Sequence, residues 1–585
     1  MTIHPSQKNP FANPDLPSMD DILIRIEMDY QIPHQRRHDM CSAIRALSRL
    51  FERPLTMIPA SPDFLRRLFE GAHHIPAGIS ERRLQNIRSL IMAAFRHVGI
   101  SSSLAPYGAP LVPEWLSFIS SITSPYQKSA ISRFARYCST GGVSIADVSD
   151  STIEAYLAAL IAETLVKKPH LNVQTLCRTW NQVASDNADH RMPPLTVPKK
   201  PSRAYAISKD QLSPNLLRDI DDYLRFLAGD DLIEGLSKPL RPRSIEAIKG
   251  NLMRYLGALH HSDVDVSSIQ SLEEMVRFET FRIALEWLWN RFDHKPSQGI
   301  ADIAWSIRCI AVKHLECDEQ TAELFSNLLA KVRPPRQGLS KKNRASMQQF
   351  DDDAVVKRLL HITDKLWALA QKETARKKAS LLAQSAVALD ILTFAPMRIK
   401  NLQHLRIDRH LGWSNKRLRI SIPPEEVKNS EYLDYLLPLS TSARIADYTD
   451  NWRCLFYPKN NPHLFPGSKG RPKDESALRK QISKTLLKHT GIRLTPHQFR
   501  HATAKILLDE KPGHYEVVRK VLGHKNITTT YEHYAGAESQ SAIELFDNVI
   551  LDIKGGKNTK LPQRTNMAEQ AFIDPLNPFG KGDRR

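Results

Sequence analysis

Apolar residues recur at three- and four-residue spacing through most of this chain, which is the spacing of one face of an α-helix. The pattern is clearest in the segments 40–51, 84–95, 114–122, 126–138, 150–165, 215–229, 243–261 and 276–292. Two basic, proline-containing stretches, 193–203 and 333–344, interrupt it. Single cores stop growing at roughly 250–300 residues, and this chain has 585. We therefore expect several domains, most of them helical.

The interruptions predict five parts. We expect an N-terminal helical module over 1–110, further helical modules over 111–200 and 205–335, a different domain over 350–550, and a flexible basic tail over 552–585. The helical modules resemble one another weakly, as repeats or as unrelated helices of similar composition.

The fourth part mixes helical and strand patterns. A long helix is predicted over 351–371, and the segment 378–395 is apolar nearly all round, so we expect it at the centre of the domain. Alternation predicts strands over 417–423 and 434–440, joined as a hairpin. Further helices are expected over 476–491, 496–510 and 514–523. The predicted fold class is mainly α, ending in a mixed α+β domain with a small β-hairpin sheet.

Composition narrows the partners. Lys plus Arg exceed Asp plus Glu by 82 to 63, a formal net charge of +19, which favours nucleic acid as a ligand. The six cysteines are scattered, without the spacing of a zinc site or a disulfide framework. No stretch has the length of a membrane span, and the N-terminus lacks the apolar core of a signal peptide. We expect a soluble protein of the cytoplasm, associated with the nucleoid if it is bacterial, with no membrane partner.

Five short strings in the fourth part carry residues suited to chemistry on phosphate. They are APMRIKNLQHL with Arg398, VKNSEYLDYLLP with Lys428, TPHQFRHAT with His497 and Arg500, VLGHKN with His524, and TTTYEHYAG with Tyr531 and Tyr534. Each string is weak alone, and the order and spacing of all five raise its significance. Together they resemble the catalytic domain of the tyrosine recombinases, the phage integrase family, over 351–550. The earlier helical modules resemble, less specifically, the core-binding and arm-binding modules of that family.

These residue types suit phosphoryl transfer without a metal. The guanidinium groups of Arg398 and Arg500 can meet the charge that gathers on the non-bridging oxygens of the phosphate. A tyrosine hydroxyl, with a pKa near 10, needs positive charge or a base nearby to become a nucleophile. The resemblance implies that His497 is the base-like residue and that His524 hydrogen-bonds the scissile phosphate. His501 is expected to pack or to cap.

Two assignments have alternatives. Lys428 is expected to protonate the departing 5′-oxygen as a general acid, and Lys416 lies at the other side of the same predicted hairpin. Tyr534 stands ten residues after His524 and Tyr531 seven, and the family's spacing favours Tyr534 as the nucleophile.

The sequence also departs from the family's usual pattern. Asn401 stands three positions after Arg398, where an acidic residue is usual, and Ala-Pro-Met precedes Arg398 in place of a Thr-Gly-Leu type. Neither change removes a reacting group, and both suggest a divergent branch in which a supporting hydrogen bond from Asn401 survives. Near the end, helical spacing gives an apolar stripe that packs on its own core or, as the resemblance implies, on a neighbouring subunit: Ala542, Leu545, Phe546, Val549 and Ile550.

The resemblance implies a site-specific DNA recombinase or integrase of a mobile element. It would cut and rejoin double-stranded DNA through a 3′-phosphotyrosine without metal, cofactor or ATP, as a homotetramer on DNA with possible accessory recombinase subunits. A type IB topoisomerase-like enzyme and a catalytically silent DNA-binding accessory protein are the alternatives.

Overall fold

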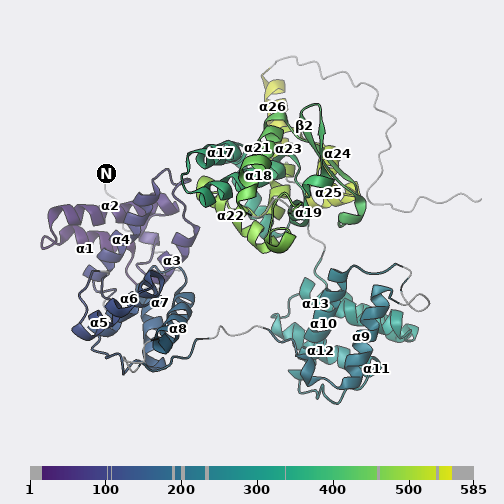
Figure 1. Cartoon of the computed structure of the whole chain (residues 1–585), viewed down its shortest axis with the longest axis horizontal. Coiled ribbons are helices and arrows are strands. Elements are labelled where there is room, and N and C mark those ends of the chain that lie inside the picture. The colour runs from purple at the N-terminus through teal and green to yellow at the C-terminus, as the bar shows by residue number, and fades with distance from the viewer. Residues whose placement is uncertain are drawn as a thin grey trace, which may run out of the picture. The chain divides into compact units, whose positions relative to one another are not determined.

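The computed structural model describes residues 16–101, 103–106, 108–186, 192–198, 204–230, 236, 238–335, 338–456, 461–534 and 539–555 (Figure 1). The chain divides into two compact units, one of Met1–Ala72 and Asn86–Arg336 and the other of His73–Gln85 and Gln337–Arg585. The five-part division expected from the sequence stays a prediction. Residues 556–585 of the expected tail lie outside the described residues.

In the described residues of the first unit the regular elements are helices, joined by turns and loops and by one isolated β-bridge between Ser18 and Pro59. Its helices are α1 (Met19–Met28), α2 (His34–Phe51), α3 (Pro62–Gly71), α4 (Glu81–His97), α5 (Pro113–Ser121), α6 (Pro125–Thr140), α7 (Asp150–Glu163), α8 (Pro169–Asp186), α9 (Pro214–Ala228), α10 (Pro242–His260), α11 (Leu272–Met275), α12 (Phe278–Arg291), α13 (Gln298–Cys309) and α14 (Glu319–Val332). Serine side chains cap several N-termini, as Ser18, Ser149 and Ser213 do for α1, α7 and α9. None of the helices in the described parts of the chain combines the length and apolar character that a membrane span requires.

Two buried clusters hold the later helices of this unit together. Helices α5–α8 close around an aromatic group in which the rings of Trp115 and Trp180 lie 6.1 Å apart. Helices α9–α14 close around Tyr255, Phe281 and Phe325, and the last two rings lie 4.5 Å apart. Each cluster has the size and packing of a separate small core.

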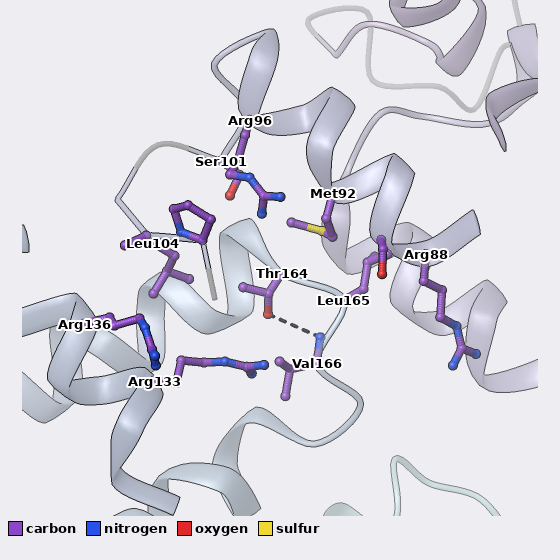
Figure 2. A pocket seen from close by; sticks show the side chains of 13 residues that line it. Arg88, Met92, Arg96, Ser101, Leu104, Arg133, Arg136, Thr164, Leu165 and Val166 are labelled. Carbon is purple, nitrogen blue, oxygen red and sulfur yellow. Dashed lines mark hydrogen bonds between the residues drawn. The ribbon is translucent and has the colours of Figure 1, made fainter. Parts of the chain in front are cut away.

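A cavity of about 460 Å³ opens between α4, α6 and the segment after α7, and four arginines are among its lining residues (Figure 2). Arg88 donates from Nη2 to the carbonyl of Phe69 at 2.8 Å, and Arg136 donates from Nε to the carbonyl of Ala109 at 3.3 Å. Such bonds from guanidinium groups to carbonyls connect segments that are apart in the chain. At least two of the arginines therefore have structural roles here.

The second unit combines helices with a small sheet. Its helices are α15 (Lys341–Met347), α16 (Asp353–Leu360), α17 (Ile362–Lys372), α18 (Arg376–Phe394), α19 (Ile399–His404), α20 (Ile407–His410), α21 (Leu439–Asp447), α22 (Glu475–Thr490), α23 (Pro496–Glu510), α24 (Tyr515–Leu522), α25 (Ile527–Tyr534) and α26 (Ser539–Lys554). With the sheet below, this confirms the predicted fold class, mainly α with a mixed α+β final domain.

Helix α18 is the centre of this unit, as its apolar sequence predicts. Its buried residues include Ala383, Val387 and Ile391, and α17, α21, α22 and α23 pack around it (Figure 1). The single long helix predicted over 351–371 is wrong. His361 leaves the helical region with φ −92° and ψ 3° and separates α16 from α17. No proline or glycine marks this break in the sequence, so local signals could not predict it.

The sheet is antiparallel, in the order β1-β2-β3 among the described residues, with β1 (Leu411–Ser414), β2 (Arg417–Ile422) and β3 (Leu433–Leu436). Strands β2 and β3 confirm the predicted hairpin, although β3 ends before α21 begins at Leu439. Strand β1 was not predicted. It joins β2 through Asn415 and Lys416, both with positive φ, as a tight two-residue hairpin turn requires.

Gly523 ends α24 in the left-handed conformation, with φ 60°, and leads directly into His524. A Cβ atom at this position would lie 2.4 Å from Cδ2 of Leu433, whose side chain is buried in the core. Gly513 also has positive φ, at 81°, but a Cβ there would meet nothing within 4 Å. A substitution at Gly513 therefore tests backbone strain alone, whereas a substitution at Gly523 tests the same strain together with a steric collision.

We predict that Gly513→Ala costs about 1 kcal/mol, because alanine disfavours positive φ. Gly523→Ala is expected to cost about 2–4 kcal/mol, because the collision with Leu433 adds to the same strain. Thermal unfolding of the full chain with each substitution checks the order. Equal shifts of the unfolding midpoint would contradict the contact between Gly523 and Leu433.

Candidate active site

Arg398 stands at the N-cap of α19, after the turn that leaves α18. Its Nη1 donates to Oδ1 of Asn429 at 3.1 Å, and Nδ2 of Asn429 donates to the carbonyl of Gly523 at 2.6 Å. Asn429 lies in the connection between β2 and β3. One amide side chain therefore links the turn before α19, the sheet and the turn after α24.

Arg500 lies on α23 and is only 4% exposed. Its Nη1 donates to the carbonyl of Pro396, and its Nη2 donates to the carbonyl of Leu522 at 2.6 Å. Burial and, after it, the charge of Arg398 lower the pKa of Arg500 to about 10. The two hydrogen bonds thus hold the guanidinium in place, although burial and the nearby charge of Arg398 disfavour its charged form.

The two arginines form a positive centre, and no carboxylate of the described residues is among the groups that shift their pKa values. After burial, the pKa of Arg500 is affected by the charge of Arg398 and by the hydroxyl groups of Tyr435 and Tyr534. The hydroxyl group of Tyr435 also affects the pKa of Arg398. Burial lowers the pKa of Arg398 as well. Two desolvated guanidinium groups near one another favour an anion in the space that they face.

Two of the predicted histidines lie close to this centre. Burial, followed by Arg500 and Arg398, lowers the pKa of His497, which is in the first turn of α23. The same causes lower the pKa of His524 to about 4, and its Nδ1 is hydrogen-bonded to Oγ1 of Thr530 at 3.0 Å. Near neutral pH the imidazole of His524 is therefore uncharged.

The two candidate lysines lie at opposite ends of β2. Lys428 is exposed in the connection between β2 and β3, and its charge is among those that lower the pKa of His497. Lys416 lies in the turn between β1 and β2. The structure thus brings Lys428, rather than Lys416, into the electrostatic environment of the histidine.

The two candidate tyrosines differ sharply in exposure. Tyr534, the last residue of α25, is 2% exposed, while Tyr531 is 46% exposed and packs against Tyr515 with 4.4 Å between ring centroids. Burial raises the pKa of Tyr534, and Arg500 counteracts that rise. Tyr534 is therefore the buried one of the two candidates, and its hydroxyl lies within the electrostatic influence of Arg500.

His501 is buried, as packing requires, but it also makes a polar contact that was not expected. Its Nδ1 lies 2.8 Å from the hydroxyl oxygen of Tyr534. Burial, followed by the charges of His497, His533, Arg500 and His524, lowers the pKa of His501 to about 3. A neutral imidazole thus meets the Tyr534 hydroxyl.

Three supporting residues were missed by the sequence reasoning. Besides Asn429 and His501, Tyr435 donates from its hydroxyl to the carbonyl of Val521 at 3.0 Å. No local pattern distinguishes Asn429 or Tyr435 from other polar residues of a strand or loop. Asn401, expected to keep a supporting hydrogen bond, has a buried Nδ2 that makes none within the described residues.

Within the parts of the chain that the structure describes, no three His, Cys, Asp or Glu side chains are grouped so that they could hold a metal ion. Arg398 and Arg500 carry positive charge, and each also has hydrogen-bond acceptors from the protein, so the charge of this centre suits an anion rather than a cation.

Residues 352–541 match the model of the phage integrase family. A tyrosine recombinase XerD of Chlamydia pneumoniae is 36% identical over 117 residues, which are 19% of this chain and 38% of the relative. The chain thus spans well under half the length of that relative. A tyrosine recombinase XerC of Serratia marcescens is 22% identical over 363 residues, which are 59% of this chain and 99% of the relative.

Among solved structures, a lambda integrase dimer bound to a COC′ core site is 12% identical, with a TM-score of 0.33, over 64% of this chain and 88% of that one. The sequence match coincides with the segment that carries Arg398, Lys428, His497, Arg500, His524 and Tyr534. Residues 352–541 therefore form a domain of the phage integrase family.

Proposed function

We propose that this protein is a site-specific DNA recombinase of a mobile element, which cuts and rejoins double-stranded DNA through a 3′-phosphotyrosine. The observation that carries the proposal is the pair of desolvated guanidinium groups, Arg398 and Arg500, beside the buried hydroxyl of Tyr534. A phosphodiester supplies the missing negative charge and, as phosphoryl transfer proceeds, gathers more of it on its non-bridging oxygens.

In the proposed cleavage step, Oη of Tyr534 attacks the scissile phosphorus. The bond from phosphorus to Oη forms, the bond from phosphorus to the 5′-oxygen breaks, and the hydroxyl proton of Tyr534 passes to the imidazole of His497 as base. Neutral imidazoles suit this role and that of His524, whose Nδ1 is bound to Thr530, so that Nε2 is left for a phosphate oxygen.

Lys428 is proposed to give a proton to the departing 5′-oxygen. This lysine is exposed in the connection between β2 and β3, and its charge is among those that lower the pKa of His497. The freed 5′-hydroxyl then attacks a phosphotyrosine of the partner duplex. The bond energy is kept in the phosphotyrosine, so the proposal needs neither ATP nor a metal.

Exchange between two duplexes implies four protomers on the DNA. The net charge of +19 supports binding to the DNA backbone. Exposed apolar residues on α26, among them Phe546 at 64% and Leu551 at 62%, support a contact between subunits. Recruitment of accessory recombinase subunits belongs to the same proposal.

Two other functions share some of these features. A type IB topoisomerase-like enzyme would religate the same strand, and it would relax supercoiled DNA as a monomer. A catalytically silent DNA-binding protein would bind without covalent attachment. The complete set of reacting side chains favours an active enzyme, and the helical modules before residue 335 favour recombination.

We predict that wild-type protein forms an SDS-resistant adduct with a nicked duplex from the ends of the genomic element that encodes it. Tyr534→Phe should abolish the adduct, because the Tyr534 hydroxyl is the proposed nucleophile, whereas the other tyrosine hydroxyl that Arg500 affects, that of Tyr435, donates to the carbonyl of Val521. Tyr531→Phe is the matched control, and it should retain most of the adduct because its side chain is exposed and packs on Tyr515. Denaturing gels measure both.

Loss of the adduct in Tyr531→Phe but not in Tyr534→Phe would assign the nucleophile to Tyr531. DNA binding without any adduct in wild type would instead favour the silent accessory protein.

We predict that Lys428→Ala slows cleavage by about 10²-fold or more, because the 5′-oxygen loses its general acid. A duplex with a 5′-bridging phosphorothiolate at the mapped scissile position should restore the rate, since a thiolate leaves without a proton. Lys416→Ala, at the other end of β2, is the control and should cleave the ordinary duplex like wild type. If the phosphorothiolate does not restore Lys428→Ala, the lysine has another role.

A further inference from the structure

We propose that His501 is a positioning residue that holds the reacting oxygen of Tyr534 by a hydrogen bond donated from Nδ1–H. This inference rests on the proposed function, because it assigns a role toward Tyr534 as the nucleophile. It adds a third histidine to the pair that the family resemblance implies.

The geometry distinguishes His501 from the other two histidines. Its Nδ1 lies 2.8 Å from Oη of Tyr534. The ring of His524 is nearly parallel to the tyrosine ring, with 6.5 Å between centroids, and its Nδ1 is occupied by Thr530. The ring of His497 contacts His501 edge to face, with 5.0 Å between centroids. Among these histidines, only His501 is hydrogen-bonded to the tyrosine oxygen in the described residues.

The support of His501 is rigid. It follows Arg500 directly on α23, and Arg500 is fixed by the carbonyls of Pro396 and Leu522. His501 is 7% exposed and Tyr534 is 2% exposed, so neither side chain has room to rotate freely. A hydrogen bond between two buried groups on separate helices therefore fixes the tyrosine oxygen relative to the arginines.

The direction of the hydrogen bond follows from the chemistry of the attack. The hydroxyl proton of Tyr534 must leave for His497, and negative charge grows on Oη as the new bond to phosphorus forms. A donated N–H offsets this charge and leaves the O–H free, whereas an accepting nitrogen would hold the proton that has to depart. Burial, more than the neighbouring groups, lowers the pKa of His501 to about 3, so its ring is neutral near pH 7 and has one N–H to donate. In rejoining, the same N–H stabilises the departing tyrosinate.

The test compares two substitutions at this position on the nicked duplex. His501→Leu should slow adduct formation by about 10²-fold, which is typical of the loss of one donor to a developing charge. His501→Asn places an amide N–H where Nδ1 stands and should remain within about fivefold of wild type. His533→Leu is the control, since it removes a neighbouring imidazole whose Nδ1 has no hydrogen-bond partner in the described structure. Thermal unfolding and DNA binding verify that each variant is folded.

If His501→Leu does not fold, the proposal can still be tested by measuring which ring nitrogen of His501 carries the proton. Nitrogen-15 NMR of the full chain, with His501 assigned by its absence in His501→Asn, should find the proton on Nδ1. A proton on Nε2 alone would overturn the proposal, as would a folded His501→Leu that cleaves like wild type or faster, or an Asn variant as slow as Leu. Failure of the proposed function is recognised separately, because wild type would then form no adduct that depends on Tyr534.

Discussion

The guanidinium of Arg500 joins the parts of the candidate active site. It binds the carbonyls of Pro396, which precedes the strands of the sheet in the sequence, and of Leu522, which follows them. Arg398 follows Pro396 by two residues, and His524 follows Leu522 by two. Because Arg500 itself lies on α23 between His497 and His501, these two hydrogen bonds place most of the reacting groups relative to one another. Asn429 makes the second such connection, between Arg398 and the carbonyl of Gly523.

This arrangement costs stability in the unliganded protein. Burial lowers the pKa values of Arg398, Arg500, His497, His501 and His524, which means that their charged forms are disfavoured where they stand. The arginines keep their charge because the pKa of a guanidinium is far above neutral, while the histidines become neutral. The result is positive charge that an anion can offset, beside neutral rings that can donate or accept a proton. Elsewhere in the same unit buried charge is paired, as in the contact of Lys505 with Asp351 and Asp509.

Much of the fold follows from local patterns. The apolar segment 378–395 corresponds to the buried helix α18, and alternation over 417–423 corresponds to β2. Where local signals were absent, the prediction was wrong or incomplete. The break at His361 has no glycine or proline, and β1 is a short strand whose pairing with β2 depends on the turn at Asn415 and Lys416. The supporting role of Asn429 depends on contacts with residues 31 and 94 positions away.

The sequence by itself determined the helical character of the chain, its basic charge, and the order of the six side chains suited to phosphoryl transfer, because periodicity, composition and residue type are local properties. The tertiary structure decided which of two nearby tyrosines is buried beside the arginines and which of three histidines is bonded to its hydroxyl. Tyr534 and His501 are 33 residues apart and lie on different helices. Their contact depends on the position of α25 relative to α23, because a hydrogen bond tolerates only a few tenths of an ångström in the distance between its two atoms. No spacing in the sequence encodes that distance.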